Sequence, residues 1–313
     1  MFTFSICTYN HSKYIIQHLE SIKYIINEYS HEQKTHLLIC DDYSTDDTIY
    51  KIEKWLDKNS DIFKKHKLVK SKINQGTVSN FKTLISNIET PYFKLLAGDD
   101  IYNKYDVVNR YSSKNLIVGF SLPFNLSKNN YFEDIQSNYF TRQRMFLLNN
   151  NSNFFKKYII ANNSLSAPGM GYNIEWLKDE DLNNYFNEIK YIEDRPLWYF
   201  IFKNKKINIE LELTPYVLYR TNVGVTSKSS KFHQEYLNDL KKIDKLFFKD
   251  TGYANKLFKK LYFKILFNIY KKNIFSYSKK ISRYESNIKS NFTEYQKHID
   301  FIINKAEGFE SEN

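Results

Sequence analysis

The first hundred residues alternate between short apolar runs and longer segments in which apolar residues recur every three or four positions. The apolar runs predict four strands, at residues 2–8, 36–40, 67–71 and 91–97. The segments between them have the spacing of amphipathic helices, most clearly in Ile15, Ile16, Leu19, Ile22, Ile25 and Ile26. Short apolar strands that alternate with helices are typical of a mostly parallel sheet covered by helices on both faces. We therefore predict an α/β fold.

The rest of the chain has a less regular pattern. Residues 115–124 predict a further strand, 207–218 an antiparallel strand, and 197–202 an aromatic helix. From about residue 232 the composition shifts to helical segments, with a three-four spacing at 281–302. The acidic end, 307–313, is expected to be frayed. We predict a main domain at 1–230 and a helical extension at 231–313.

The charge of the chain favours polyanionic partners. Lys and Arg total 46 against 35 Asp and Glu, which gives a net charge of +11. Phosphate groups, anionic lipid and nucleic acid all suit such a charge, although an AT-rich genome would also enrich lysine. Cys7 and Cys40 lie in apolar runs without metal-ligand spacing. We expect both to be buried thiols in a reducing compartment.

Polar residues follow three of the predicted strands at the point where each strand ends. Thr8–Asn10 follow the first strand, Asp41 and Asp42 the second, and Asp99 and Asp100 the fourth. Ligands of parallel sheets bind at the carboxyl ends of the strands. The polar clusters are therefore expected to converge on one cleft.

Each acidic cluster has a chemical and a structural interpretation. Asp99 and Asp100 could bridge Mg²⁺ or Mn²⁺ to a substrate phosphate, or form a Gly-Asp turn that caps the next helix. In the segment after the second strand, Ser44 and Asp47 resemble a capping box. That leaves the Asp41-Asp42 pair to accept hydrogen bonds from a base N–H or a ribose hydroxyl.

An ordered set of motifs resembles the family 2 glycosyltransferases. The motifs are Thr8-Tyr9-Asn10, Asp41-Asp42 with Asp46, Asn74-Gln75-Gly76 with Asn80, and Gly98-Asp99-Asp100. The resemblance covers residues 1 to about 110. It implies the GT-A fold, a Rossmann-like and mostly parallel sheet flanked by helices, here followed by a C-terminal helical extension. It also implies an inverting enzyme with a nucleotide-diphosphate sugar donor, for which UDP is the expected nucleotide.

The resemblance assigns donor-binding roles residue by residue. Nucleotide contacts are implied for Thr8, Tyr9, Asn10, Asp41, Asp42, Asn74, Gly76, Asn80 and Asp99. It implies Asp99 and Asp100 as ligands of Mn²⁺ or Mg²⁺ and of the donor diphosphate. Many members of the family have another acidic residue where Ala97 and Gly98 stand here. Metal binding would then rest on Asp100 together with the diphosphate.

The resemblance also implies a catalytic base in the pair Glu193-Asp194. An inverting transfer needs a carboxylate that takes the proton of the acceptor hydroxyl as its oxygen attacks the anomeric carbon. Asp194 is the candidate base, and Glu193 is expected to orient or bind the acceptor. Without the family context, an acidic pair ahead of Pro196 is typical of a helix N-terminus.

The pair Tyr219-Arg220 resembles the stretch that closes the catalytic domain in many relatives. Asn222 stands where those relatives have a histidine that assists metal or diphosphate binding. Arg220 remains a candidate phosphate ligand. The alternative is an ion pair between Arg220 and a carboxylate at the edge of the sheet.

On this interpretation, residues 1–110 form a nucleotide-binding half and 111–230 an acceptor-binding half of a GT-A catalytic domain. The expected acceptor is a hydroxyl of a glycan or lipid-linked oligosaccharide of capsule, lipopolysaccharide or a related surface glycan. The basic aromatic segment 256–280 suits either an anionic membrane surface or packing on the catalytic domain. Helices at 281–302 would allow a homodimer. Since no secretory leader and no spanning segment are evident, we expect a cytoplasmic protein, peripheral on the inner face of the plasma membrane.

Two other classes of protein share some of these sequence features. A nucleotidyltransferase also uses carboxylates and a metal at strand ends, but it usually has a Gly-rich basic loop where this chain has residues 8–14. A nucleic-acid-binding protein would fit the charge and the aromatic content. The best-organised polar residues are acidic, however, so we expect no nucleic-acid partner.

Overall fold

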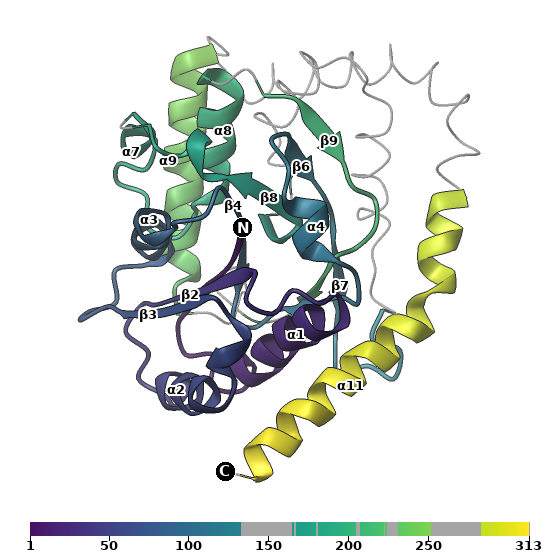
Figure 1. Cartoon of the computed structure of the whole chain (residues 1–313). Coiled ribbons are helices and arrows are strands. Elements are labelled where there is room, and N and C mark those ends of the chain that lie inside the picture. The colour runs from purple at the N-terminus through teal and green to yellow at the C-terminus, as the bar shows by residue number, and fades with distance from the viewer. Residues whose placement is uncertain are drawn as a thin grey trace.

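A seven-stranded sheet forms the centre of the described part of the chain (Figure 1). The structure is a computed structural model that describes residues 1–132, 165, 167–179, 181–204, 207–221, 223, 231–251 and 283–312. The strand order is β3-β2-β1-β4-β8-β6-β9. The strands are β1 (Phe2–Thr8), β2 (Thr35–Asp41), β3 (Lys65–Lys70), β4 (Tyr92–Ala97), β6 (Leu116–Val118), β8 (Met170–Asn173) and β9 (Ile209–Leu211).

The first four strands are parallel to one another, as the sequence predicts. β1 pairs with β2 and β4, and β2 pairs with β3, all in parallel. β8 is antiparallel to both of its neighbours, β4 and β6, while β6 pairs in parallel with β9. The sheet is therefore mixed only in its second half, and the mostly parallel α/β fold is confirmed.

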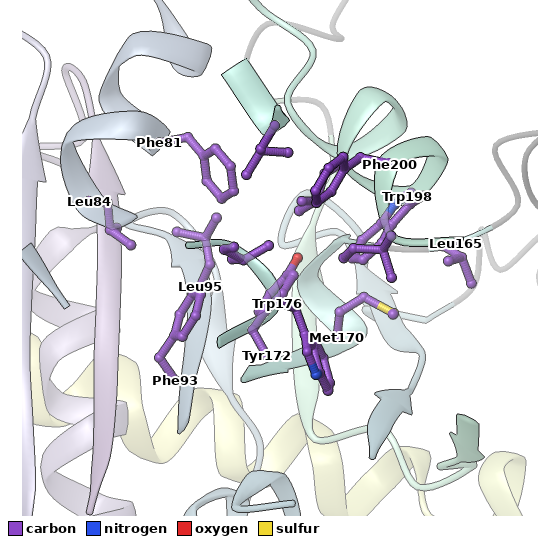
Figure 2. Packing of buried hydrophobic residues seen from close by; sticks show 14 of the residues in the cluster. Phe81, Leu84, Phe93, Leu95, Leu165, Met170, Tyr172, Trp176, Trp198 and Phe200 are labelled. Carbon is purple, nitrogen blue, oxygen red and sulfur yellow. The ribbon is translucent and has the colours of Figure 1, made fainter. Parts of the chain in front are cut away.

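Helices cover both faces of this sheet. On one face, α1 (Ile15–Glu28) and α2 (Thr48–Asn59) share a hydrophobic cluster with Phe4, Ile6 and Ile39. The helices of the other face are α3 (Thr77–Asn87), α8 (Asp194–Asn204) and α9 (His233–Thr251). Figure 2 shows part of the cluster there, in which Phe81, Tyr172 and Trp198 come from α3, β8 and α8. Cover by helices on both faces explains why β1 and β2 are buried along almost their whole length.

A second, three-stranded sheet lies beside the first, in the order β5-β10-β7. The C-terminal helix α11 (Phe292–Ser311) packs against this sheet and against α1, with Ile299 and Ile302 buried beside Leu122 and Leu218 (Figure 1). Residues 283–290 are also helical. The remaining elements are β5 (Ile101–Tyr102), β7 (Ser121–Phe124), β10 (Val217–Arg220), α4 (Val107–Tyr111), α7 (Leu182–Tyr185) and the short 3-10 helices Ser60–Ile62, Ala167–Gly169 and Ile174–Trp176.

Two of the strand predictions are wrong because each joins two separate strands. Residues 115–124 form β6 and β7, which belong to different sheets. The chain turns between them at Gly119, where an added Cβ would lie 2.5 Å from the carbonyl oxygen of Gly169. Residues 207–218 are not one antiparallel strand, since β9 is parallel to β6, and β10 is parallel to β7 and antiparallel to β5.

Three helix-end predictions are also wrong. The aromatic helix predicted at 197–202 already begins at Asp194. The segment predicted to be frayed is helical to Ser311, and its Glu310 carboxylate pairs with the Lys51 ammonium at 2.5 Å. Asp47 is the N-cap residue of α2 but makes no capping side-chain hydrogen bond.

Among the described helices, none combines the length and the apolar character needed to cross a membrane.

Candidate active site

The polar clusters after β1, β2 and β4 meet at one edge of the sheet. Thr8 lies opposite Asp41 in the β1–β2 register, and Cys7 lies opposite Ala97 in the β1–β4 register. The Asp42 amide donates to the Thr8 carbonyl at 3.0 Å, and the Gly98 amide donates to the Cys7 carbonyl at 3.2 Å. The clusters therefore lie together at one edge of the sheet. That they line one cleft stays a prediction.

The loop after β1 is tied to the loop after β2. The backbone amide of Asn10 donates to the Ser44 hydroxyl, and the Asn10 side-chain oxygen accepts from the Thr45 amide, both at 2.8 Å. The buried carboxylate of Asp41 accepts hydrogen bonds from the amide and the hydroxyl of Ser44. Ser44 thus links the two loops, where the sequence had suggested a helix cap. The loop that carries Tyr9 is thereby joined through Ser44 to Asp41.

Asp42 organises the turn that contains Asn74 and Gly76. Its two carboxylate oxygens accept from the amides of Gln75 and Gly76 at 2.8 and 2.7 Å. The Asn74 side chain donates to the Asp42 carbonyl at 3.2 Å. Gly76 has φ +91°, and an added Cβ would lie 2.7 Å from the Lys190 carbonyl oxygen, so only glycine fits. Burial raises the pKa of Asp42, and the two amide donors oppose that rise.

Asn80 is buried behind this turn. Its side-chain amide donates to the Cys40 carbonyl at 2.9 Å, at the end of β2. The contact fastens α3 to β2 just before Asp41. The position of Asn80 therefore suits a support for the turn and strand end that would face a nucleotide.

Asp100 and Arg220 form the centre of the second acidic cluster. One Asp100 carboxylate oxygen accepts from the Arg220 backbone amide at 2.9 Å. The Arg220 guanidinium donates to the Asp99 carbonyl at 2.8 Å and to the Gln17 side chain at 2.6 Å. Its carbon lies 4.5 Å from the Tyr14 ring centroid and 4.9 Å from that of Phe124. Arg220 is buried, and its hydrogen bonds to Asp99 and Asp100 fix the acidic turn on the protein-interior side.

The donor set at this turn fits a metal that is completed by a substrate. The second carboxylate oxygen of Asp100 is buried and has no hydrogen-bond partner among the described residues. Burial first, and then the charge of Asp99, raise the pKa of Asp100 well above its usual range. The described residues contain no group of three or more His, Cys, Asp and Glu that would hold a metal alone. Mg²⁺ and Mn²⁺ often combine one or two carboxylates with substrate phosphates, and the Asp99-Asp100 pair suits that mode.

His18 was not singled out by its sequence. Its Nδ1 lies 2.8 Å from the Asp100 carbonyl oxygen, and burial lowers its pKa to about 4. A neutral imidazole that donates from Nδ1 satisfies this carbonyl. The Gly98 backbone also lies close to two polar side chains, since an added Cβ would lie 3.0 Å from His11 Nδ1 and 3.3 Å from the Thr8 hydroxyl. Only the position of His18 on the buried face of α1 could have drawn attention to it.

The pair Glu193-Asp194 lies at the start of α8, close to the strand ends. Burial first, and then the charge of Asp194, raise the pKa of Glu193 to about 8. The same carboxyl contributes to the raised pKa of Cys7 at the end of β1, after burial and Cys40. Asp194 accepts from the Arg195 backbone amide at 2.6 Å. Lys190, three residues before Glu193, lies against Gly76 in the turn held by Asp42. The segment that leads into this pair therefore lies beside the Asp42 turn.

The helix α9 holds the segment that precedes this pair. The Asp239 carboxylate accepts from the amides of Lys190 and Tyr191 at 2.8 and 2.7 Å. The Arg195 guanidinium pairs with Asp244 at 2.6 Å. Tyr236 and Ile243 of the same helix join the hydrophobic cluster of α3 and α8. The predicted division of the chain at residue 230 stays a prediction, although α9 packs on the same core as α8.

Two sequence predictions lie outside the described residues. They are Asn222, in the position of the family histidine, and the basic segment 256–280.

Comparison with known proteins identifies the family. The model of the glycosyl transferase family 2 matches residues 3–164, which is more than half of the chain. The chain belongs to glycosyl transferase family 2. The nucleotidyltransferase and nucleic-acid-binding alternatives are not supported by this match, and no curated protein matches the chain.

Solved structures confirm the GT-A fold for this family member. S. aureus TarS (residues 1–349) in complex with UDP-GlcNAc has a TM-score of 0.52 at 18% identity, over 82% of this chain and 69% of that chain. The mannosyltransferase PcManGT from Pyrobaculum calidifontis, in complex with GDP-Man and Mn²⁺, has a TM-score of 0.53 at 11% identity. That match covers 96% of this chain and 84% of the mannosyltransferase. At these identities the likeness establishes the fold alone.

Proposed function

We propose that the chain transfers a sugar from a nucleotide-diphosphate sugar to a hydroxyl of a glycan or lipid-linked oligosaccharide, with inversion at the anomeric carbon. The observation that supports this proposal most is that the Asp41–Asp42 and Asp99–Asp100 pairs lie at one edge of the sheet in a family 2 chain. The segment that leads into Glu193–Asp194 lies against Gly76, in the turn held by Asp42. The two structural neighbours hold UDP-GlcNAc and GDP-Man. A UDP-sugar is the first donor to test, and GDP-sugars are the second.

The donor would lie along the ends of β1, β2 and β4. Thr8, Tyr9, Asn10 and the Asp41-Asp42 pair would contact the base and ribose, with Asn74, Gly76 and Asn80 shaping that side. Asp99 and Asp100 would hold the diphosphate through Mn²⁺ or Mg²⁺. When bound, the metal would neutralise the charge that develops on the leaving diphosphate. Arg220 adds a buried positive charge behind the acidic turn, with its guanidinium already engaged by Asp99 and Gln17.

The two carboxyl groups of the acceptor side would have different roles. A raised pKa of about 8 keeps Glu193 protonated at neutral pH, so that it can donate a hydrogen bond to the acceptor. Asp194 would take the proton of the acceptor hydroxyl. The acceptor oxygen then bonds to the anomeric carbon while the bond to the diphosphate oxygen breaks and its electron pair leaves with the diphosphate.

The proposed acceptor would be reached at a membrane surface. The basic aromatic sequence at 256–280 favours a lipid-linked acceptor of surface-glycan synthesis at an anionic surface, which would be the inner face of the plasma membrane. Flotation of the full chain with vesicles that contain anionic lipid tests this part. Vesicles of neutral lipid are the control, and equal flotation with both would contradict it. Dimerisation through the C-terminal helices is tested by the mass of the chain in solution.

The base assignment is tested with Asp194→Asn and a matched surface variant. The wild-type chain with Mn²⁺ is expected to release nucleoside diphosphate from its donor, to water or to an added acceptor. Asp194→Asn should lower that rate at least a hundredfold, in line with the usual contribution of a general base, while donor affinity is retained. Asp57→Asn, on the exposed side of α2, should match the wild type. Wild-type rates in Asp194→Asn would contradict the assignment. Formation of nucleoside triphosphate and sugar 1-phosphate from the donor and added pyrophosphate would indicate a nucleotidyltransferase.

A further inference from the structure

Three aromatic rings from distant parts of the chain meet beside the ends of β1 and β2. The Tyr9 and Phe232 ring centroids are 6.0 Å apart, with an angle of 56° between the planes. The Phe232 ring stacks on Tyr191, at 5.1 Å and 29°. Tyr9 follows β1, Tyr191 lies two residues before Glu193, and Phe232 directly precedes α9. The tilted Tyr9 and Phe232 rings form a corner, and Tyr191 supports the Phe232 side of it.

The supporting side of this corner is rigid. Tyr191 is buried, and its backbone amide donates to the Asp239 carboxylate at 2.7 Å. The Phe232 carbonyl accepts from the Tyr236 amide at 3.0 Å in the first turn of α9. Phe232 is therefore presented by a helix start that is itself fastened to the segment of Tyr191.

Lys231 lies over this corner, and the Tyr9 and Phe232 side chains are both only partly buried. This lysine is exposed, and its Nζ lies 4.9 Å from the Phe232 centroid and 5.8 Å from the Tyr9 centroid. Cation–π contacts at exposed sites are weak, so a flat ligand can replace this one.

The corner also lies beside carboxylates that the proposed function gives to the nucleotide. The charge of Asp42 contributes to the raised pKa of Tyr191, after burial and the contact with Glu235. Gly76, in the turn held by Asp42, lies against Lys190, the neighbour of Tyr191. An aromatic surface next to hydrogen-bonding carboxylates suits a nucleobase, which has a π face and polar edges.

We propose that Phe232 is a nucleobase-stacking residue, which forms with Tyr9 the corner that receives the base of the donor. This inference rests on the proposed function, which places the nucleotide at Tyr9, Asp41 and Asp42. Stacking accepts every base, so the corner contributes affinity for the nucleoside and not selection among bases. It also links donor binding to α9, since the same helix start carries Phe232.

The test separates the base from the diphosphate. Phe232→Leu keeps an apolar side chain of similar volume but removes the π face, and Phe232→Trp keeps an aromatic ring. Dissociation constants for UDP and for pyrophosphate, each with Mn²⁺, are measured by titration calorimetry. Phe232→Leu should weaken UDP binding roughly tenfold, the scale of base–aromatic stacking, and leave pyrophosphate unchanged. Phe232→Trp should bind UDP as the wild type does, and so should Leu237→Ala, on an exposed part of α9.

Three results would overturn the inference. Wild-type affinity for UDP in Phe232→Leu would show that the ring does not contact the base, while the proposed function would stand. Equal losses for UDP and pyrophosphate would show that the ring only supports the whole site. If the wild type bound no nucleoside diphosphate, the proposed function would fail first, and the inference with it.

Discussion

The carboxylate of Asp239 on α9 accepts a hydrogen bond from the backbone amide of Tyr191 at 2.7 Å. A second amide, that of Lys190, donates to the same carboxylate oxygen at 2.8 Å. Asp239 is buried, and its carboxylate is the hydrogen-bond acceptor for both amides. The contact joins a helix from the last third of the chain to the segment that leads into the proposed catalytic pair.

Replacing Asp239 is expected to destabilise the chain and to loosen this segment. Asp239→Ala leaves two amides without an acceptor, which should lower the free energy of unfolding by about 1–3 kcal/mol. Asp239→Asn keeps one acceptor oxygen and should cost less. Urea unfolding of both variants measures the difference, with Gln234→Ala on the exposed side of α9 as the control. An Asp239→Ala variant as stable as the wild type would contradict the role of this contact.

The free energy of unfolding is expected to decrease as the pH rises, because of Glu193. Its pKa is about 8 in the folded chain, against an ordinary value of 4.5. Between these pH values the folded chain holds a proton that the unfolded chain has lost, so the free energy of unfolding decreases as the pH rises. Glu193→Gln should remove this part of the slope, whereas Glu32→Gln, at an exposed position, should not. Unfolding temperatures from pH 4.5 to 8 test the prediction, and identical slopes for the wild type and Glu193→Gln would refute it.

Lys94 is expected to act in the opposite direction at higher pH. This buried lysine on β4 donates to the carbonyls of Pro168 and Met170 at 2.6 and 2.9 Å, and burial lowers its pKa from 10.5 to about 7. Between pH 7 and 10.5 the unfolded chain holds the extra proton, so stability rises with pH. Lys94→Met should abolish this rise in a series of unfolding measurements. Lys114→Met, at an exposed position, should retain it, and retention in both variants would contradict the prediction.

Arg220→Lys tests whether the geometry of the guanidinium matters beyond its charge. Lysine cannot reach the Asp99 carbonyl and the Gln17 side chain with one planar group, although the backbone hydrogen bond to Asp100 remains. We expect stability to fall by about 1–3 kcal/mol and Mn²⁺-dependent binding of UDP to weaken. Gln17→Ala removes one partner only and should have a smaller effect on both. Equal values for Arg220→Lys and the wild type, by thermal unfolding and titration calorimetry, would show that the charge suffices.

The sequence predicts the first half of the fold well because local signals decide it. Apolar runs identify β1 to β4, and the polar residues at their ends converge because parallel strands end at one edge. In the second half of the chain, contacts between distant segments determine where the strands begin and end. The turn between β6 and β7 exists because Gly119 and Gly169 meet backbone to backbone, and neither glycine shows this in its own segment.

The sequence motifs point to the acidic residues of the proposed site, but not to the residues that hold their segments in place. Asp239 and Phe232 act on backbone amides and rings far away in the chain, and such contacts leave no periodic pattern. Lys94 did leave a signal, since it is a single lysine inside the apolar run Tyr92–Ala97. A charged residue in a predicted buried strand requires a partner, and here the partners are two carbonyl groups.

The central claim, a donor site for a nucleotide-diphosphate sugar at the ends of β1, β2 and β4, is tested most directly by ligand-induced stabilisation. The unfolding temperature of the full chain is measured with a panel of UDP- and GDP-sugars, with and without Mn²⁺, beside Asp100→Asn. At least one nucleotide sugar should raise the unfolding temperature, since a ligand at a hundred times its dissociation constant stabilises a protein by about 2.7 kcal/mol. The shift should be larger with Mn²⁺ and should be reduced in Asp100→Asn. If no nucleotide diphosphate or nucleotide sugar raised the unfolding temperature, with or without the metal, the claim would be contradicted.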